Sequence, residues 1–205
     1  MVGGRRFNSY GKHMGFVRSL VILASRSPRR KSALRQIVPR FRSFAVREPT
    51  RAKGRTLALK TAFLARSKCR LASHRFPSAI VIAADTLASC QGKILGKASS
   101  RQKADRMLRL ISNHRMSAVT SIALYSPKNK HNKVWSERGW VKFREITLEE
   151  IDSYLASKKW QGKAAAVNVE EKPVSGWVTE RGGERGAIVG LPLKKLRAEL
   201  RSSRE

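Results

Sequence analysis

The chain has 205 residues, a length that suits one domain, and its 44 Lys and Arg against 14 Asp and Glu give a formal net charge of +30, which attracts polyanions. Two cysteines cannot build a disulfide framework or a multi-cysteine zinc site, and no apolar run approaches the about 18 residues that a membrane span needs. We therefore exclude membrane proteins, disulfide scaffolds and zinc fingers, and expect a protein of a reducing compartment, the cytoplasm.

The first 18 residues are rich in Gly and Arg and show neither a helical nor a strand period. We interpret residues 1–18 as a flexible basic arm in front of one domain that spans residues 19–205. Two alternatives stay open at this point. The absence of acidic residues before Glu48 is typical of transit peptides, and translation could instead start at Met14.

Strands and helices are predicted to alternate from Leu20 onward. The apolar run over residues 20–24 predicts a strand that is buried on both faces, and the spacing of apolar residues predicts a helix over residues 29–37. A second, short strand is expected over residues 41–46. Apolar residues at three- and four-residue steps then predict an amphipathic helix over residues 56–72 with a basic outer face.

The middle of the chain repeats this pattern. Residues 78–84 predict a second fully apolar strand, which we expect to end at Asp85. A turn is predicted over residues 91–93 with a short strand on each side. A helix with a serine N-cap is expected over residues 99–111.

The last part of the chain is predicted to be rich in strands. Two strands are expected over residues 118–125 and 133–146, and a capping box (Thr-Leu-Glu-Glu) predicts a helix over residues 148–156. After Trp160 we expect short strands with glycine turns, followed by a final helix that ends near Leu200. Because strands alternate with helices early and cluster later, the fold class is α/β or α+β with a mixed sheet.

The segment between the first strand and the first helix is a candidate anion site. Ser27 is placed as N-cap and Pro28 as the first helical residue, so free backbone N–H groups and the positive end of the helix dipole are available there. The first turn holds Arg29, Arg30 and Lys31, each disfavoured by about 0.3–1 kcal/mol when exposed, and a bound anion would remove that penalty. The alternative is an ordinary capped helix in a chain that is basic throughout.

Asp85 is the candidate catalytic or metal-binding residue. It follows an apolar strand, where ligands of α/β sheets usually bind, and a carboxylate there can hold a divalent metal ion or accept a proton from water. The alternative is an aspartate that starts a turn. Lys68 and Lys97 are each able to reach a phosphate as mobile charges, although a solvated lysine is the common case in so basic a chain.

Six motifs, in chain order, carry a resemblance to a known family. They are Leu-Ala-Ser-Arg-Ser-Pro-Arg-Arg over 23–30, Leu-Ala-Arg-Ser-Lys over 64–68, Ile-Ala-Ala-Asp-Thr over 82–86, Ile-Leu-Gly-Lys over 94–97, Val-Lys-Phe-Arg over 141–144 and Val-Gly-Leu-Pro-Leu over 189–193. With these motifs the chain resembles the Maf (septum formation) family of nucleoside triphosphate pyrophosphatases from about Leu20 to Leu200.

The resemblance implies hydrolysis of a nucleoside triphosphate to nucleoside monophosphate and pyrophosphate, assisted by a divalent metal cation, Mg²⁺ or Mn²⁺. It implies a Maf/inosine-triphosphatase-like α/β (α+β) fold, in which a mixed sheet carries a cleft between two lobes. It also implies a homodimer, since the family is often dimeric, and a role in clearing non-canonical or modified nucleotides.

Residue roles follow from the same resemblance. Asp85 would accept the proton of the attacking water and lie next to the metal. Glu48 matches in part a second acid that helps to hold the metal, although Arg47 stands where another acid is common. The remaining positions would contact the phosphates or the base, with Arg29 and Thr86 tuning substrate choice: Ser25, Arg29, Arg30, Lys68, Thr86, Lys97 and Glu170.

The chain departs from the family in three later segments. The block Asp-Lys-Ala-Gly-x-Tyr-x-Ile-Gln stands here as Gly-Lys-Ala-Ala-Ala-Val-Asn-Val-Glu over residues 162–170, and residues 112–116 and 181–188 are altered too. Glu170 replaces a Gln that influences base recognition in the thymidine/uridine-type branch. A Glu occurs there in the branch that acts on 7-methylguanosine triphosphate, so the base preference stays open.

A second hypothesis comes from another functional class. The net charge, the basic arm and the altered base-recognition block favour a catalytically weakened Maf-like protein that binds nucleic acid or ribosomes. An enzyme should lose pyrophosphate release when Asp85 is replaced, whereas a binder should show a steep salt dependence that Asp85 does not affect. The survival of the phosphate-end motifs together favours the enzyme, with nucleic acid as a secondary partner.

Overall fold

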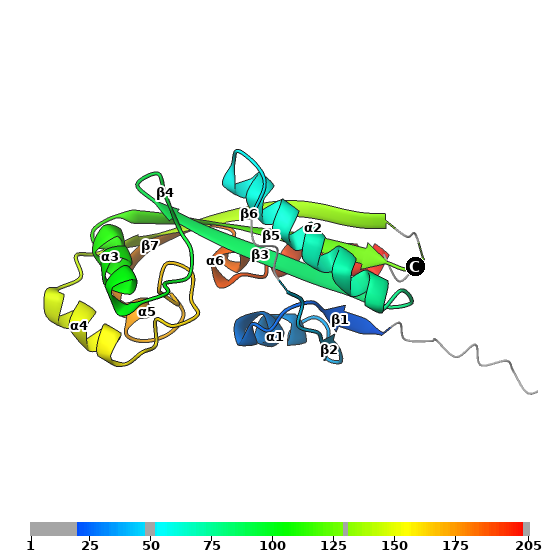
Figure 1. Cartoon of the computed structure of the whole chain (residues 1–205), viewed down its shortest axis with the longest axis horizontal. Coiled ribbons are helices and arrows are strands. Elements are labelled where there is room, and N and C mark those ends of the chain that lie inside the picture. Colours follow the sequence, from blue (N-terminus) through cyan, green and yellow to red (C-terminus); the bar gives the residue numbers. More distant parts are fainter. Residues whose placement is uncertain (1–19, 48–51, 129–130, 203–205) are drawn as a thin grey trace, which may run out of the picture.

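The computed structural model of the chain describes residues 20–47, 52–128 and 131–202 (Figure 1), so the arm expected over residues 1–18 lies outside the described residues. The strands are β1 (Val21–Leu23), β2 (Arg42–Ser43), β3 (Ile80–Cys90), β4 (Lys93–Leu95), β5 (Arg115–Ser126), β6 (His131–Phe143) and β7 (Val178–Gly183). The helices are α1 (Pro28–Arg35), α2 (Leu57–Arg75), α3 (Arg101–Ile111), α4 (Leu148–Ala156), α5 (Val174–Trp177), α6 (Arg185–Val189) and α7 (Leu193–Ser202).

The strands form one mixed sheet. Its order is β2-β1-β3-β5-β6-β7, and β4 pairs with the far end of β3. The pairings of β1 with β2 and with β3 are parallel, whereas those of β3 with β4 and of β5, β6 and β7 along the sheet are antiparallel. The mixed α/β class predicted from the sequence is therefore confirmed.

One lobe surrounds the short parallel strands. Side chains alternate between the two faces of a strand, so Ile22 packs with α2 on one face while Leu23 packs with α1 and α7 on the other. Both residues are fully buried. The predicted N-cap of α1 is confirmed, because the Ser27 hydroxyl accepts a hydrogen bond from the Arg30 backbone N–H. Thr56 caps α2 in the same way.

A second lobe surrounds the other end of the long strands β3, β5 and β6. There α3, α4 and α5 gather beside the sheet (Figure 1), around a core that includes Leu108, Phe143, Ile151 and Trp177. The predicted capping box at the start of α4 is confirmed. The Thr147 hydroxyl accepts from the Glu150 backbone N–H, and the Glu150 carboxylate accepts from the Thr147 N–H. The long antiparallel strands therefore join the two lobes into one sheet.

Two predictions about elements were wrong. The strand before Asp85 does not end there, because β5 pairs with β3 as far as Cys90 and keeps it extended. After Trp160 the chain forms turns, α5 and α6, with β7 as the strand of this region within the described residues. Ala165 and Ala166 are fully buried with positive φ angles of 52° and 59°, a backbone that cannot continue a strand. No described helix has the length and apolar character that a membrane crossing demands.

Candidate functional site

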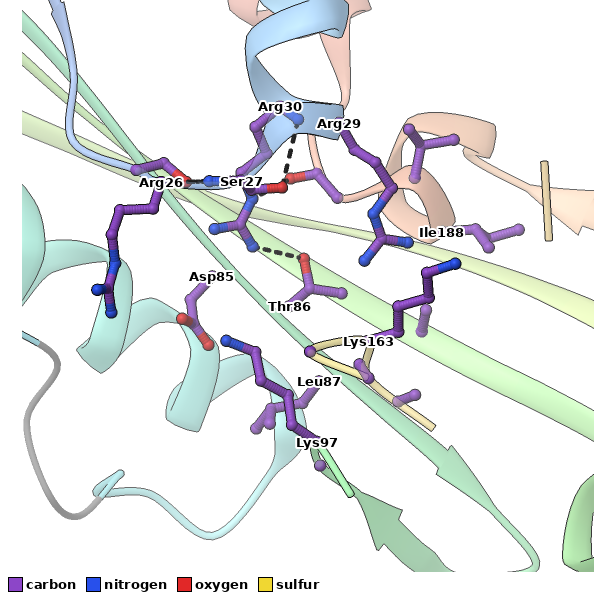
Figure 2. Close-up of a pocket in the computed structure, with 18 of the residues that line it drawn as sticks. Arg26, Ser27, Arg29, Arg30, Asp85, Thr86, Leu87, Lys97, Lys163 and Ile188 are labelled. Atoms are coloured by element: carbon purple, nitrogen blue, oxygen red, sulfur yellow. Dashed lines mark hydrogen bonds between the residues drawn. The ribbon is translucent and has the colours of Figure 1, made fainter. Parts of the chain in front are cut away.

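The candidate site lies where one edge of β3 is open. β1 pairs with this edge as far as Ile82, and β4 pairs with it again from Ala88, while β5 covers the opposite edge throughout. Between these two points the edge has no strand partner among the described residues, and a cavity of about 720 Å³ opens there. Its walls come from the turn between β1 and α1, from α2, from β3 and from the turns after α4 (Figure 2).

Asp85 lies in this open stretch and lines the cavity. Its Oδ1 accepts a hydrogen bond from Lys68 Nζ at 2.6 Å, and Lys68 comes from the buried face of α2. The two side chains are only 4% (Lys68) and 10% (Asp85) exposed. The Lys68 ammonium therefore holds the Asp85 carboxylate in one position at the cavity wall.

The turn between β1 and α1 forms the wall next to Asp85. The Ser27 N–H donates to Ser25 Oγ at 3.2 Å, and the Ser43 hydroxyl of β2 donates to the Ser25 carbonyl at 2.7 Å. These bonds hold the turn so that the N-terminal end of α1 faces the cavity, together with Arg26. The candidate anion site predicted from the sequence is therefore part of the cavity wall, and a helix N-terminus in that position attracts phosphate.

Arg30 connects this wall to the C-terminal part of the chain. Its Nε donates to the Gly190 carbonyl at 2.9 Å, and its Nη2 donates to Thr86 Oγ1 at 3.1 Å. Thr86 Oγ1 lies 2.7 Å from Thr120 Oγ1, which donates to the Ala187 carbonyl at 2.7 Å. Because the Thr120 proton goes to Ala187, Thr86 donates to Thr120 and accepts from Arg30. This chain of hydrogen bonds fixes the segment around Gly190 against β3.

The opposite wall of the cavity carries two lysines. Lys97 follows β4 and forms an isolated antiparallel bridge with Ala164, which joins the wall to the turns after α4. In Figure 2 its side chain points toward Asp85. Lys163 lies one residue before Ala164, and its Nζ is 2.6 Å from a carboxylate oxygen of Glu171. Both lysines and Glu171 line the cavity.

Arg29 lies at the end of the cavity away from Asp85, on the same side as Lys163 (Figure 2). Its Nη1 is 3.4 Å from Asn168 Oδ1. Burial lowers the pKa of the Arg29 guanidinium from its ordinary value, and the nearby carboxylate of Glu171 opposes that shift. The Lys163 ammonium, followed by Asn168, holds the pKa of Glu171 below its usual range. Glu171 is therefore ionised near neutral pH.

Glu170 does not line the cavity, although the family resemblance placed it among the base contacts. Its carboxylate accepts a hydrogen bond from Arg181 Nη1 at 3.2 Å and another from Arg185. These arginines, with Arg185 contributing most, lower the pKa of Glu170. The neighbouring Glu171 faces the cavity instead. Sequence reasoning missed Glu171, and its position directly after Glu170 was the one signal that could have drawn attention to it.

The second predicted metal ligand, Glu48, lies outside the described residues. Among the residues that are described, no three His, Cys, Asp or Glu side chains gather as a metal cluster. Mg²⁺ in nucleotide-binding enzymes, however, needs only one or two carboxylates in addition to the phosphates of the substrate. The carboxylate of Asp85 at the cavity wall fits that kind of site.

The cavity as a whole suits a polyphosphate with one reactive position. Within the part of the chain that the structure describes, the acidic lining residues are Asp85 and Glu171, and the basic ones are Arg26, Arg29, Arg30, Lys68, Lys97 and Lys163. The predicted residues Ser25, Arg29, Arg30, Lys68, Asp85, Thr86 and Lys97 are thus brought together, whereas Glu170 is not. Fixed positive charge of this kind stabilises the charge that develops on phosphoryl oxygens during transfer.

Comparisons with known proteins agree with this geometry. A family model described as Maf-like protein matches residues 20–203. A protein of Carboxydothermus hydrogenoformans named dTTP/UTP pyrophosphatase is 32% identical over 185 residues, which cover 88% of this chain and 97% of that protein. A protein of the same name from Pyrococcus horikoshii is 34% identical over 179 residues, covering 85% and 92% of the two chains.

A third relative has a broader name. The nucleoside triphosphate pyrophosphatase of Ehrlichia canis is 34% identical over 133 residues, which cover 63% of this chain and 67% of that protein. The solved structure of the Staphylococcus aureus Ham1 protein aligns with 90% of this chain and 99% of its own at 14% identity and a TM-score of 0.48, a distant likeness that adds nothing to the sequence matches.

Proposed function

The chain belongs to the Maf-like protein family, and from this premise we propose that it hydrolyses nucleoside triphosphates to a nucleoside monophosphate and pyrophosphate. It is then a hydrolase that acts on acid anhydrides. Relatives that match nearly their whole length are named dTTP/UTP pyrophosphatase, so dTTP and UTP are the first substrates to consider. The observation that carries the proposal is the buried carboxylate of Asp85, held 2.6 Å from Lys68 in a cavity otherwise rich in cations.

Asp85 acts as proton acceptor in the proposed reaction. The oxygen of a water molecule forms a bond to the α-phosphorus, and its proton passes to the Asp85 carboxylate. The bond between the α-phosphorus and the bridging oxygen breaks, and pyrophosphate leaves with the bonding electrons. Lys68 supports this role because its ammonium donates a hydrogen bond to the carboxylate and holds it in place.

The cations and the helix end bind the triphosphate. Arginine guanidinium groups give forked hydrogen bonds to phosphate oxygens, and a lysine acts as an adjustable point charge. Lys97 is the candidate for the phosphate contact, and Ser25 lies in the turn that directs the N-terminal end of α1 toward the cavity. Arg29 lies at the other end of the cavity and is the candidate for a contact with the base. Arg30 and Thr86 are bonded to each other and to the Gly190 segment, which supports a role in shaping the phosphate wall.

A divalent cation, Mg²⁺ or Mn²⁺, is part of the proposal. Asp85 would hold it together with the phosphates of the substrate, and Glu48 is the second candidate ligand. When bound, such an ion neutralises charge on the leaving pyrophosphate. A series of assays with EDTA, Mg²⁺ and Mn²⁺ tests this directly.

Pyrophosphate release from a panel of nucleoside triphosphates tests the proposed function. The wild-type protein should cleave dTTP or UTP in the presence of Mg²⁺ or Mn²⁺, and Asp85→Asn should lower kcat by about 10²- to 10⁴-fold, the contribution of a general base. Asp152→Asn, an exposed carboxylate that pairs with Arg101 outside the cavity, is the matched control and should keep full activity. Equal activity of wild-type and Asp85→Asn would refute the mechanism.

The same panel separates the finer alternatives. Faster cleavage of modified pyrimidine or 7-methylguanosine triphosphates than of dTTP and UTP would support clearance of non-canonical nucleotides. If no nucleotide is cleaved while RNA or DNA binds tightly and with steep salt dependence, the weakened nucleic-acid binder replaces the enzyme. The net charge of +30 is the observation that favours this second candidate.

Two expectations about the whole protein remain proposals. The family is often dimeric, and light scattering of the purified protein would reveal a homodimer. The cytoplasmic location rests on the composition, and fractionation of cells that express the tagged protein would test it.

A further inference from the structure

Among the described residues, the carboxylates of Asp85 and Glu171 line the cavity, and of these two Asp85 has a role in the proposed hydrolysis. Asp85 lies at the end formed by β3 and α2. Glu171 lies at the wall formed by the turns after α4, where Arg29, Lys163 and Asn168 are its polar neighbours. An ionised carboxylate can only accept hydrogen bonds, and so can an ionised phosphate, so Glu171 suits a part of the substrate that carries a donor. A nucleotide whose phosphates lie near Asp85 extends toward this second wall with its base.

Glu171 is accessible to a ligand in a way that Asp85 and Glu170 are not. Its side chain is 50% exposed, against 10% for Asp85, and it has one ion-pair partner, Lys163, with 17% exposure. Glu170 is held between Arg181 and Arg185, outside the cavity. Glu171 is therefore the carboxylate on this wall that can exchange water for a ligand.

The chemistry of an ionised carboxylate limits which base it can bind. It accepts hydrogen bonds and donates none. Uracil, thymine and guanine carry a ring N–H on the edge used in base pairing, flanked by at least one carbonyl oxygen. Cytosine and adenine carry an unprotonated ring nitrogen at the corresponding place with an amino group beside it, so a carboxylate that accepts from the amino group also faces the lone pair of the ring nitrogen. Lys163 and Arg29, as donors, match the flanking carbonyl oxygens.

We propose that Glu171 reads the base in this cavity and selects bases with a ring N–H on the pairing edge, uracil, thymine and guanine, over cytosine and adenine. The proposal rests on the proposed function, because it needs a nucleotide in the cavity. It assigns the reading to a residue other than Glu170, which the family pattern indicates. Lys163 positions the carboxylate, since its ammonium lies 2.6 Å from it.

Steady-state hydrolysis of UTP, GTP, CTP and ATP by three variants tests this inference. The wild-type protein should prefer UTP to CTP in kcat/KM. Glu171→Gln should lower the UTP:CTP ratio about tenfold, because an amide can donate to the cytosine nitrogen as well as accept from uracil. Glu170→Gln, the adjacent control outside the cavity, should leave the ratio unchanged. Glu171→Asp should keep the direction of the preference, because it retains the carboxylate.

A binding experiment separates the failure of this inference from failure of the proposed function. Affinities of α,β-methylene UTP and α,β-methylene CTP, which are not cleaved at this bond, are measured for wild-type and Glu171→Gln protein. A fall in the UTP:CTP affinity ratio in the variant supports the inference even if hydrolysis is slow. An unchanged ratio, or an equal change in Glu170→Gln, overturns it. Loss of all hydrolysis in the wild-type protein, by contrast, counts against the proposed function.

Discussion

Two lysine–carboxylate pairs line the same cavity, and burial makes them physically different. In both pairs the lysine Nζ lies 2.6 Å from a carboxylate oxygen. The side chains of Lys68 and Asp85 are 4% and 10% exposed, whereas those of Lys163 and Glu171 are 17% and 50% exposed. Equal distances do not mean equal energies, because water competes with the exposed pair and screens it. The buried pair fixes the position of the Asp85 carboxylate, and the exposed pair leaves a carboxylate that can change partners.

The same contrast separates the two walls in sequence. The wall with Asp85 retains the family motifs, and its geometry depends on backbone features, the end of β1 and the capped start of α1. The wall with Glu171 has lost most of its motif over residues 162–170. The β-bridge between Lys97 and Ala164 still connects it to the segment after β4. Backbone pairing thus preserves the cavity where side chains have changed.

Replacing each lysine by Met should give the largest contrast between the two pairs. Lys68→Met leaves the Asp85 carboxylate buried without its ammonium partner, and we expect a loss of about 3–5 kcal/mol in the free energy of unfolding. Lys163→Met removes an exposed pair and should cost less than about 1 kcal/mol. Urea unfolding of the two variants and of the wild-type protein measures both values. Similar losses would show that burial does not distinguish the pairs.

Activity should separate Lys97 from Lys163. Lys97 extends toward Asp85, where the proposed reaction would develop charge on the phosphate, so Lys97→Met should lower kcat/KM for UTP by about 10²-fold. Lys163 already pairs with Glu171, and Lys163→Met should lower it by about tenfold or less. Initial rates of pyrophosphate release provide the measurement. A larger loss in Lys163→Met than in Lys97→Met would contradict the proposed position of the phosphates near Asp85.

Thr120 links the cavity wall that contains Asp85 to α6. Removing its hydroxyl tests how much this buried hydrogen bond contributes to stability. Thr120→Val deletes the hydroxyl between Thr86 and the Ala187 carbonyl in a fully buried position, so we expect a loss of about 1–3 kcal/mol in stability. Thr179→Val, which removes an exposed hydroxyl, should cost less than about 0.5 kcal/mol. Thermal and urea unfolding report the difference. Equal effects would mean that the chain of hydroxyls contributes nothing.

Acidification should lower the stability of the second lobe because it protonates Glu150. This is the smallest of the expected effects. The Arg144 guanidinium lowers the pKa of Glu150 to about 2 from an ordinary value of 4.5. A depressed carboxylate pKa stabilises the fold above pH 4.5, and this contribution disappears as the pH falls through 2. The two side chains are 41% (Arg144) and 32% (Glu150) exposed, so screening limits the contribution to about 1 kcal/mol or less.

Urea unfolding between pH 7 and pH 2 checks this expectation. The stability difference between the wild-type protein and Glu150→Gln should be constant above pH 5 and should shrink from pH 4.5 downward. A difference that grows on acidification would contradict the assigned sign. The first lobe provides the contrast, because residues 20–47 and 52–79 contain no carboxylate side chain.

Local signals predicted much of the fold correctly. The N-caps Ser27 and Thr147 were confirmed, and the buried strand predicted over residues 20–24 was found over Val21–Leu23, because caps and buried runs act over a few residues. The course of β3 through Asp85 was missed. Its extension depends on hydrogen bonds to β5, where Asp85 pairs with Ser121. This partner is far away in the sequence, so the residues around Asp85 do not reveal it.

The sequence by itself determined which chemical groups were expected around Asp85. They are the aspartate itself, two lysines and a capped helix start, in an order that resembles one family. Tertiary structure alone decided how they are used. In the folded chain Asp85 lies on an open strand edge, and Arg30 donates a hydrogen bond to the Gly190 carbonyl. Glu171, and not Glu170, lines the cavity. The physical reason is that arginines of β7 and α6 hold Glu170, whereas Lys163 in the turns after α4 holds Glu171. Those contacts exist only after the chain has folded.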